Sequence, residues 1–516
     1  MPREITVEVK ISSIWIYPFY TLNVARKLGV NPTSMKLENI FTDWEHVPGK
    51  PGIRLPKFNF QLIYDEENYI FKVPIGFGLE KVLNTLNKDL ENIPVNVKYN
   101  VSPYPIRKVK MKLKDGIKVR NDIQKNAIGF LLREKNPGKF LTLATGFGKT
   151  FCVIYTASKK DVPFLIITSK LVKQWITQIK KFLDISPDEI FEIRGRSSIK
   201  KLMNEKKPKH LFYVSSTSTL YRQMKDTDIN LDNVFKHLGI GVKVFDEAHE
   251  FYKTNCEIDC NSNFAETFYL TATPMRSDTR ENVRYTRMFS EIPKHGEETH
   301  YMNKNYIIYL INYHTHPTPL ELKKAMSWKR NMLNAHVHAA QIMANDKKQI
   351  LFFGMISQYI RKVQQVIKGK IMIVLTSLNQ IKELKTFLET YHSNVTISRY
   401  DSTVPLTERE LSKQADIILT TFGIAYAGLD IQNLAAVFSL SPFQSPIGTS
   451  QLLGRLARNT RDVFFLDFLD EGYPRMYIQR KNRLRELEPR AKKIYKNKVT
   501  EEEIMIYLNN LSGGVK

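Results

Sequence analysis

The chain has 516 residues, enough for two to four domains, and its apolar share of 42% allows sizeable cores. Lysine and arginine total 77 against 52 aspartate and glutamate residues, and the resulting formal charge of +25 favours a polyanionic partner, most commonly nucleic acid. Three cysteines are too few for a disulfide framework or a four-ligand zinc site, and no apolar run reaches membrane-spanning length. We therefore expect a cytoplasmic protein (in the host cell cytoplasm if viral) without a membrane partner.

The first 115 residues have the pattern of a separate module. Short alternating runs at 5–10 and 58–64 predict strands, and the spacing of apolar residues over 78–86 predicts a helix. The basic run Arg107–Lys114 after Pro103 and Pro105 is typical of a linker. Residues 1–115 are therefore predicted to be an N-terminal α+β accessory domain.

From about residue 141 the pattern changes to short apolar runs, each followed by turn residues and a helical stretch. Buried parallel strands alternating with helices have this pattern, which predicts an α/β fold with two tandem parallel-sheet domains. The apolar runs are 164–168, 211–214, 242–245, 371–375, 416–420, 435–439 and 463–466. The expected parts are domain 1 (116–290), a connecting segment (291–345), domain 2 (346–475) and a basic helical C-terminal tail (476–516).

The segment Ala144–Thr150 follows an apolar strand and opens a helical stretch. Its glycines let main-chain N–H groups surround phosphate oxygens, and the helix N-terminus adds positive potential. Lys149 can reach the β- and γ-phosphates of ATP, and the hydroxyl of Thr150 can bind Mg²⁺. Leu143 stands where the strict pattern has glycine. The residues predicted to contact the nucleotide here are Thr145, Gly146, Phe147, Gly148, Lys149 and Thr150.

Two acids end the apolar run at 242–245. Asp246 suits Mg²⁺ bound through water, and Glu247 suits polarising the attacking water. Alone, this pattern would indicate an acidic cluster that opens a surface helix, but the upstream phosphate loop favours catalysis.

The segment Gln451–Arg458 places Gln451, Arg455 and Arg458 near one helical face. Phosphoryl transfer needs positive charge near the γ-phosphate, and an arginine from a facing domain supplies it. A basic helix face in solvent is the alternative for any lone pair of arginines.

The order of these motifs resembles that of the superfamily 2 helicase motor over residues 115–470. Gln124 resembles the glutamine that reads adenine, and Asp246–His249 resembles the DEAH box. Other segments resemble motifs Ia, Ib, III, V and VI, namely Ile167–Trp175, Ser216–Leu220, Leu270–Arg276, Thr420–Asp430 and Gln451–Arg458. The resemblance implies two RecA-like motor domains with ATP between them and Mg²⁺ as cofactor.

The same resemblance implies roles for single residues. Lys149, Asp246, Glu247, Gln451, Arg455 and Arg458 would be catalytic, with Thr150 and Asp246 on the metal. Gln124 and Asp430 would contact the nucleotide base and ribose. Residues expected to couple the nucleotide to the bound strand are His249, Thr271 and Thr273. Residues expected near DNA phosphates are Ser169, Lys170, Thr217 and Thr421.

Lys72–Leu79 and Met288–Pro293 further resemble segments of the bacteriophage UvsW-type branched-DNA repair helicases. That resemblance implies an ATP-dependent DNA helicase or translocase that unwinds and remodels branched DNA. Fork regression and Holliday-junction branch migration in recombination, repair or replication are the implied activities. Residues 1–115 would bind forked or four-way junctions, and a monomeric motor is expected.

Other functions use similar motifs. An RNA helicase shares the motor, and so does a double-strand DNA translocase that does not separate strands. A restriction-type translocase would add a nuclease, for which Glu321–Lys323 and Glu383–Lys385 are candidate pairs, although both lie in charged helical stretches. A non-enzymatic clamp is disfavoured by the intact Lys149, Glu247 and Arg455.

Overall fold

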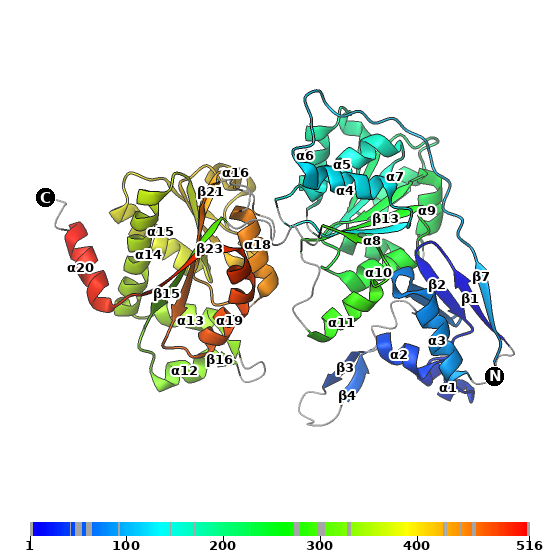
Figure 1. Ribbon diagram of the computed structural model, residues 1–516, viewed down its shortest axis with the longest axis horizontal. Coiled ribbons are helices and arrows are strands. Elements are labelled where there is room, and N and C mark those ends of the chain that lie inside the picture. Colours follow the sequence, from blue (N-terminus) through cyan, green and yellow to red (C-terminus); the bar gives the residue numbers. More distant parts are fainter. Residues whose placement is uncertain are drawn as a thin grey trace. The chain divides into compact units, whose positions relative to one another are not determined.

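The structure is a computed structural model in which the chain divides into two compact units, Met1–Glu297 and Glu298–Lys516 (Figure 1). The two units are described separately. The residues that the structure describes are 4–41, 43–46, 54–57, 64–90, 93–144, 146–169, 171–226, 228–272, 279–296, 305–327, 332–426, 429, 431–443, 445–456 and 461–512.

Unit 1 begins with a five-stranded mixed sheet in the order β5-β6-β2-β1-β7, in which β1 pairs antiparallel with β2 and parallel with β7. Its strands are β1 (Ile5–Val9), β2 (Ser13–Tyr17), β5 (Tyr64–Asp65), β6 (Ile70–Pro74) and β7 (Val95–Tyr99). The accompanying elements are α1 (Leu22–Leu28), α2 (Met35–Phe41), the hairpin β3 (Asp43–His46) and β4 (Arg54–Lys57), η2 (Ile75–Phe77) and α3 (Leu79–Asp89). The predicted α+β accessory module is present.

The rest of unit 1 is built on sheet 1, a seven-stranded sheet in the order β10-β11-β9-β12-β13-β8-β14 with every pairing parallel. Its strands are β8 (Gly138–Leu141), β9 (Phe164–Thr168), β10 (Ile190–Ile193), β11 (Phe212–Ser216), β12 (Val242–Phe245), β13 (Glu266–Leu270) and β14 (Lys294–His295). The central strands are buried on both sides, which explains their continuous apolar runs.

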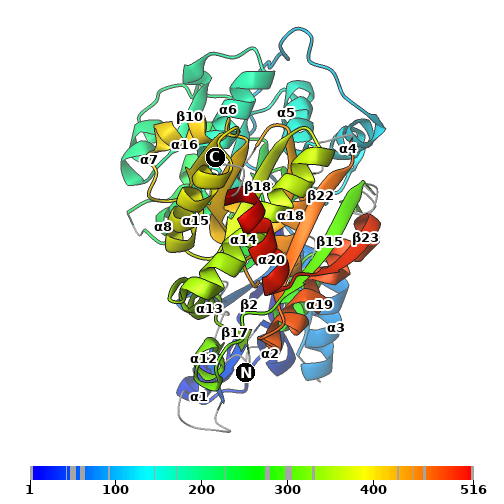
Figure 2. The same ribbon diagram turned by 90° about the vertical axis from the view of Figure 1, so that its left-hand side faces the viewer.

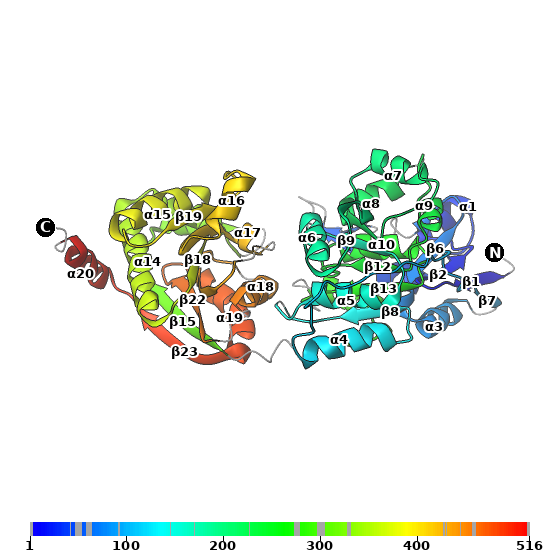
Figure 3. The ribbon, with the colours of Figure 1, turned by 90° about the horizontal axis from the view of Figure 1, so that it is seen from above.

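Helices cover both faces of sheet 1 (Figure 3). One face carries α4 (Asp122–Arg133), α5 (Lys149–Lys160) and α6 (Val172–Phe182). The other carries α7 (Arg196–Met203), α8 (Thr217–Met224), α9 (Leu231–Leu238), α10 (Tyr252–Cys260) and α11 (Thr279–Met288), with η3 (Pro187–Glu189) before β10.

The accessory module is docked on this second face. Ser13 donates from Oγ to the carbonyl of Cys260 at the end of α10 (3.3 Å), and Lys72 Nζ donates to Asn261 Oδ1 (2.5 Å). Gly76 lies so close to α11 that a Cβ there would come within 2.5 Å of the Met288 carbonyl oxygen. One apolar cluster therefore spans the module and the helices beneath it.

Unit 2 is built on sheet 2, which is also parallel throughout and has the order β19-β20-β18-β21-β22-β15-β23. Its strands are β15 (Tyr306–Tyr313), β18 (Lys370–Leu375), β19 (Ile397–Tyr400), β20 (Ile417–Thr421), β21 (Leu434–Ser439), β22 (Val463–Asp470) and β23 (Ala491–Lys498); β16 (Met326–Ser327) and β17 (Met332–Leu333) form a small hairpin. The fold class expected from the sequence, two tandem RecA-like parallel-sheet domains after an α+β module, is confirmed.

The helices of unit 2 also form two layers. The cluster on one face includes α14 (Asp346–Val366), α15 (Leu378–Tyr391) and α20 (Glu501–Ser512), and Figure 2 shows α20 against α14. The other face carries α17 (Phe422–Tyr426), α18 (Pro446–Leu456) and α19 (Arg475–Leu487). The remaining elements are α12 (Pro319–Ala325), α13 (Ala335–Met343), α16 (Leu406–Ser412) and η5 (Glu488–Arg490).

The C-terminal region requires a correction. Residues 476–516 were expected to be a helical tail, but β23 lies within them and pairs with β15 along the edge of sheet 2. The reason lies in β15, which falls inside the expected connecting segment 291–345 and has one edge that β22 leaves unpaired. Backbone hydrogen bonds from β23 to this edge outweigh the weak helical pattern of residues 491–498.

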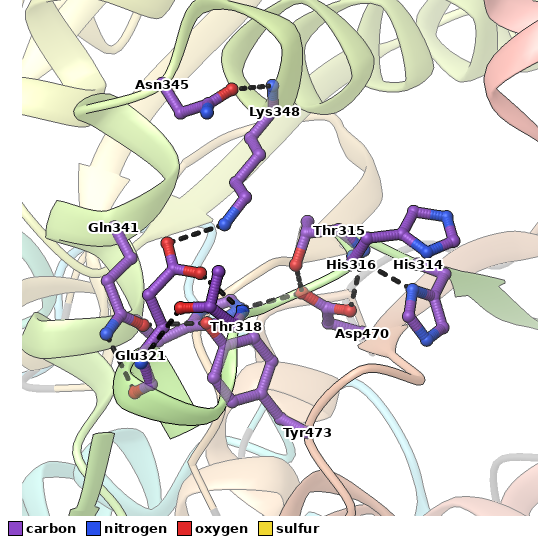
Figure 4. A network of polar contacts seen from close by, with 11 residues as sticks. His314, Thr315, His316, Thr318, Glu321, Gln341, Asn345, Lys348, Asp470 and Tyr473 are labelled. Atoms are coloured by element: carbon purple, nitrogen blue, oxygen red, sulfur yellow. Dashed lines mark hydrogen bonds and ion pairs between the residues drawn. The ribbon is translucent and has the colours of Figure 1, made fainter. Parts of the chain in front are cut away.

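A buried carboxylate attaches the end of β22 to the chain that follows β15 (Figure 4). Asp470 accepts hydrogen bonds from the Thr315 hydroxyl (2.5 Å), the Thr315 amide (3.1 Å) and His338 Nε2 (3.1 Å). Nearby, Glu321 caps the start of α12 and pairs with Lys348 Nζ at 2.6 Å. The carboxylate of the first candidate nuclease pair is thus used in structural contacts.

Candidate active site

The loop between β8 and α5 has the backbone shape expected for phosphate binding. Gly146 and Gly148 have φ angles of +94° and +87°, a region that side chains disfavour, and a Cβ on Gly148 would lie 2.6 Å from Gln124 Nε2. Because Gly148 caps α5, no side chain covers the first amides of that helix. These amides, with the half-buried Thr150, form a cradle suited to an anion.

Lys149 is the first residue of α5, and its Nζ donates to the Leu143 carbonyl at 3.1 Å. Leu143 itself is buried in the core. A Cβ on Gly296 would lie 2.7 Å from Leu143 Cδ2, so the missing side chain at Gly296 provides the space for the leucine that departs from the strict motif. Thr145 lies outside the described residues.

Gln124 lies beside this loop. Its Oε1 accepts from the amide of Arg120 (3.0 Å), and its Nε2 donates to the carbonyl of Phe147 (3.1 Å). Asn121 caps α4 and orients this segment by accepting from the Gln124 amide (3.0 Å). Gln124 therefore ties α4 to the loop before α5, and its contact with adenine stays a prediction.

Asp246 follows β12 and is nearly inaccessible to solvent. Trp175 Nε1 donates to its Oδ2 at 2.7 Å, and the Glu247 amide donates to its Oδ1 at 3.1 Å. Burial, and then the negative charge of Glu247, raise the pKa of Asp246 to about 6. Such a carboxylate suits a divalent cation. The cation would compensate for the hydration that the carboxylate loses on burial and would offset the repulsion between the two acids.

Glu247 is held in an unusual backbone conformation, with φ at +50°. Among the described residues its buried Oε2 has no hydrogen-bond partner and lies 3.4 Å from His249 Nδ1. A buried polar atom without a partner is costly in free energy, so this oxygen is suited to a group that the protein does not itself supply.

His249 joins two of the predicted motifs. Its Nδ1 lies 2.7 Å from Thr271 Oγ1, and both residues are buried. The amide of Ala248 also donates to the carbonyl of Leu270 at 2.8 Å. The turn after β12 is therefore connected to the end of β13; Thr273 lies outside the described residues.

A further link runs from this turn to the start of α8. Asn255 of α10 donates from Nδ2 to the carbonyl of Glu250 (3.0 Å), and Thr217 Oγ1 lies 3.5 Å from Asn255 Oδ1. Thr217 is buried, so a nucleic-acid contact there would have to use the main chain. Ser169 is half-buried at the end of β9, while Lys170 lies outside the described residues.

Unit 2 brings together fewer of the predicted residues. Gln451 and Arg455 lie one turn apart on α18, and the buried Gln451 Oε1 has no hydrogen-bond partner within the described part of the chain. Thr421 ends β20, where the next residue, Phe422, stacks on Phe443. Asp430 and Arg458 lie outside the described residues.

Two residues in contact with the site received no role from the sequence. Trp175 lies within a motif-like segment, yet its spacing from Asp246 along the chain gives no hint of their hydrogen bond. Asn255 lies in the middle of α10 and carries no motif that could have identified it.

Together, the sheet order and this geometry define an α/β domain whose glycine-containing loop and acid pair lie at the carboxyl ends of parallel strands. Residues 106–276, about a third of the chain, match the family described as the res subunit of type III restriction enzymes. This stretch contains Gln124, Lys149, Asp246 and Glu247. No curated protein matches the chain significantly.

Solved structures resemble the chain in fold. S. cerevisiae Dbp5 bound to RNA and ADP BeF3 has a TM-score of 0.45 and 13% identity, covering 76% of this chain and 93% of its own. T4 UvsW has a TM-score of 0.35 and 14% identity, with coverage of 96% and 100%. An HsdR subunit fragment of a type I restriction enzyme from Vibrio vulnificus has a TM-score of 0.49 and 14% identity, with coverage of 75% and 70%.

Two further findings concern the described residues alone. None of their helices has the length and apolar character that crossing a membrane requires. They also contain no group of three or more His, Cys, Asp and Glu side chains arranged to hold a metal ion.

The geometry predicts different defects for two substitutions. Glu247→Gln should retain ATP binding but lose nearly all turnover, because the amide cannot polarise the attacking water. Lys149→Ala should weaken nucleotide binding itself, because a positive charge on the phosphates is removed. Equilibrium binding of a fluorescent ATP analogue and phosphate-release assays separate the two effects, with Glu250→Gln as the control. Normal turnover by Glu247→Gln protein would disprove the assignment.

The raised pKa of Asp246 predicts a dependence on pH. At sub-saturating Mg²⁺, ATP hydrolysis should be retained above pH 6 and decline below it, because the protonated carboxyl no longer attracts the cation. Trp175→Phe removes a hydrogen bond that lowers this pKa, so the midpoint should move upward by roughly one pH unit. Turnover measured against pH at several Mg²⁺ concentrations tests this, with Trp15→Phe as the control; an unchanged midpoint in Trp175→Phe would contradict it.

Proposed function

We propose that the protein is a nucleic-acid-dependent ATPase that works as a DNA helicase or translocase. The observation that carries the proposal is the cluster at one edge of sheet 1. There the glycine-shaped loop before α5 accompanies the buried Asp246 and the half-buried Glu247, whose Oε2 lacks a hydrogen bond among the described residues.

Each group in this cluster has a function in ATP hydrolysis. Lys149 and the first amides of α5 would hold the phosphates, and Gln124 would contact the base. Asp246 and Thr150 would hold Mg²⁺, which when bound neutralises charge on the phosphate oxygens. Glu247 would orient and polarise the attacking water. His249 and Thr271 would transmit the state of this site to the strands beside it.

DNA is proposed as the polymer, and branched DNA as the substrate. The formal charge of +25 supports a nucleic-acid partner. The resemblance of Lys72–Leu79 and Met288–Pro293 to the UvsW-type helicases supports DNA, and those two segments meet in the structure where Gly76 approaches Met288. The accessory module would select forks or four-way junctions, and fork regression or branch migration would be the outcome.

One set of assays separates this proposal from its alternatives. Phosphate release should rise severalfold or more when single-stranded, forked or four-way DNA is added, and forks and four-way junctions should stimulate most. RNA that stimulates better than every DNA would favour an RNA helicase. Stimulation by plain duplex without strand separation would favour a double-strand translocase. If no nucleic acid changes the rate, the proposed function is wrong.

Arg455 is proposed to supply positive charge during hydrolysis. Arg455→Ala should reduce turnover by roughly a thousandfold, at the low end for arginines of this kind, while ATP affinity changes much less. Single-turnover hydrolysis together with ATP binding measures both quantities, and the exposed Arg485 provides a matched Arg485→Ala control. A loss of binding with a normal rate per bound ATP would exclude this role.

A further inference from the structure

An extended segment between β7 and α4 runs along one edge of sheet 1 (Figure 1). Its main chain is attached to residues that precede the sheet strands. The amide of Tyr104 donates to the carbonyl of Asn263, and the amide of Arg107 to that of Gly239, both at 2.9 Å. Because Asn263 precedes β13 and Gly239 precedes β12, this is the amino-terminal edge of the sheet, opposite the candidate active site.

The attachment continues further along the chain. The amide of Val109 donates to the Asp161 carbonyl and that of Lys114 to the Phe182 carbonyl, each at 2.9 Å. The strands between the two edges have four to five residues, so the edges are roughly 15 Å apart. A polymer bound here would therefore be distinct from one bound at the carboxyl edge.

We call residues 107–114 the basic strap, because its side chains alternate between core and solvent. The inward side chains are apolar apart from Arg107 and pack on the cluster beneath sheet 1, namely Val109, Met111 and Leu113. The outward cations are exposed, namely Lys108, Lys110, Lys112 and Lys114. Among the described residues, none of these four forms an ion pair.

More lysines extend this surface next to the strap. The Arg107 guanidinium donates to the carbonyl of His210. His210 lines a hollow of about 500 Å³ whose lining includes Lys201, Lys206, Lys207 and Lys209 together with Asp188 and Glu205. Lys209 pairs with Asp188 at 3.0 Å. The amino-terminal edge of sheet 1 therefore carries two adjoining groups of cations.

We propose that the basic strap binds the sugar-phosphate backbone of a duplex DNA arm, separate from the strand that drives the motor. Alternate residues of an extended chain are roughly 6.6 Å apart, which gives an even row of charge suited to a linear polyanion. Residues 107–114 contain no aromatic side chain on which an unpaired base could stack, so the row fits duplex better than single strand. This inference rests on the proposed function, and it describes how the strap would hold one arm of a branched substrate.

The test is the salt dependence of duplex binding by the full-length protein without nucleotide. Each neutralised phosphate contributes about 0.9 to the slope of log affinity against log salt. Replacing Lys108, Lys110, Lys112 and Lys114 by Gln should therefore reduce that slope by about 3 to 4 for a blunt 20-base-pair duplex, followed by fluorescence anisotropy. Lys110→Gln with Lys112→Gln should give about half the change, and four Lys→Arg substitutions none.

The control variant makes the same charge change elsewhere. Lys323, Lys324, Lys347 and Lys382 are exposed on unit 2, and replacing these four by Gln should leave the slope nearly unchanged. The proposal would be overturned if the strap variant and the control variant had the same salt slope, whether that slope equalled the wild-type value or was reduced in both. The proposal would also be overturned if the strap variant with four Gln residues kept the wild-type slope for duplex DNA but was no longer retained on anionic vesicles. That result would favour a membrane surface as the partner of the strap. Failure of DNA to stimulate ATP hydrolysis would refute the proposed function, while these binding slopes would still report on the strap.

Discussion

Parallel pairing of β8, β13, β12, β9 and β11 is the constraint on which the candidate site of unit 1 depends. Each strand enters the sheet from the same edge, so the turns after these strands converge at the other edge although they are far apart in sequence. The sheet can be buried on both faces because its deeply buried cations are paired: Lys139 of β8 pairs with Glu266, and Lys243 of β12 pairs with Asp259 and donates to Ser262 Oγ (2.7 Å). Without that pairing the interior of β12 would be strongly destabilised.

The turn after β12 combines several locally unfavourable features. A carboxylate is withdrawn from water beside a second acid, and that second acid adopts a positive φ angle. Such features persist only where the surrounding structure holds them, and here Trp175, the Leu270 carbonyl and Asn255 do so. Binding a cation and phosphate would relieve part of the cost, which couples occupancy of the site to the stability of this turn.

Local sequence patterns predicted the architecture well. The apolar runs such as 164–168 and 371–375 became strands β9 and β18 because burial on both faces selects continuous apolar sequence. The role of Gly146 and Gly148 could be predicted because the loop itself requires positive φ angles at these two positions. Contacts between distant segments could not be predicted in this way. The indole bond of Trp175 to Asp246, the space that Gly296 leaves for Leu143, and the pairing of β23 with β15 all depend on the tertiary fold.

The lysine-rich β23 also protects sheet 2. It covers the edge of β15, and the strand that then faces outward carries four exposed lysines, namely Lys492, Lys493, Lys496 and Lys498. Positive charge on an edge strand discourages pairing with strands of other molecules. A recombinant fragment that stops after α19 would leave the largely apolar β15 as the edge and would be prone to self-association through it. Expression of this half of the protein should therefore extend at least through α20.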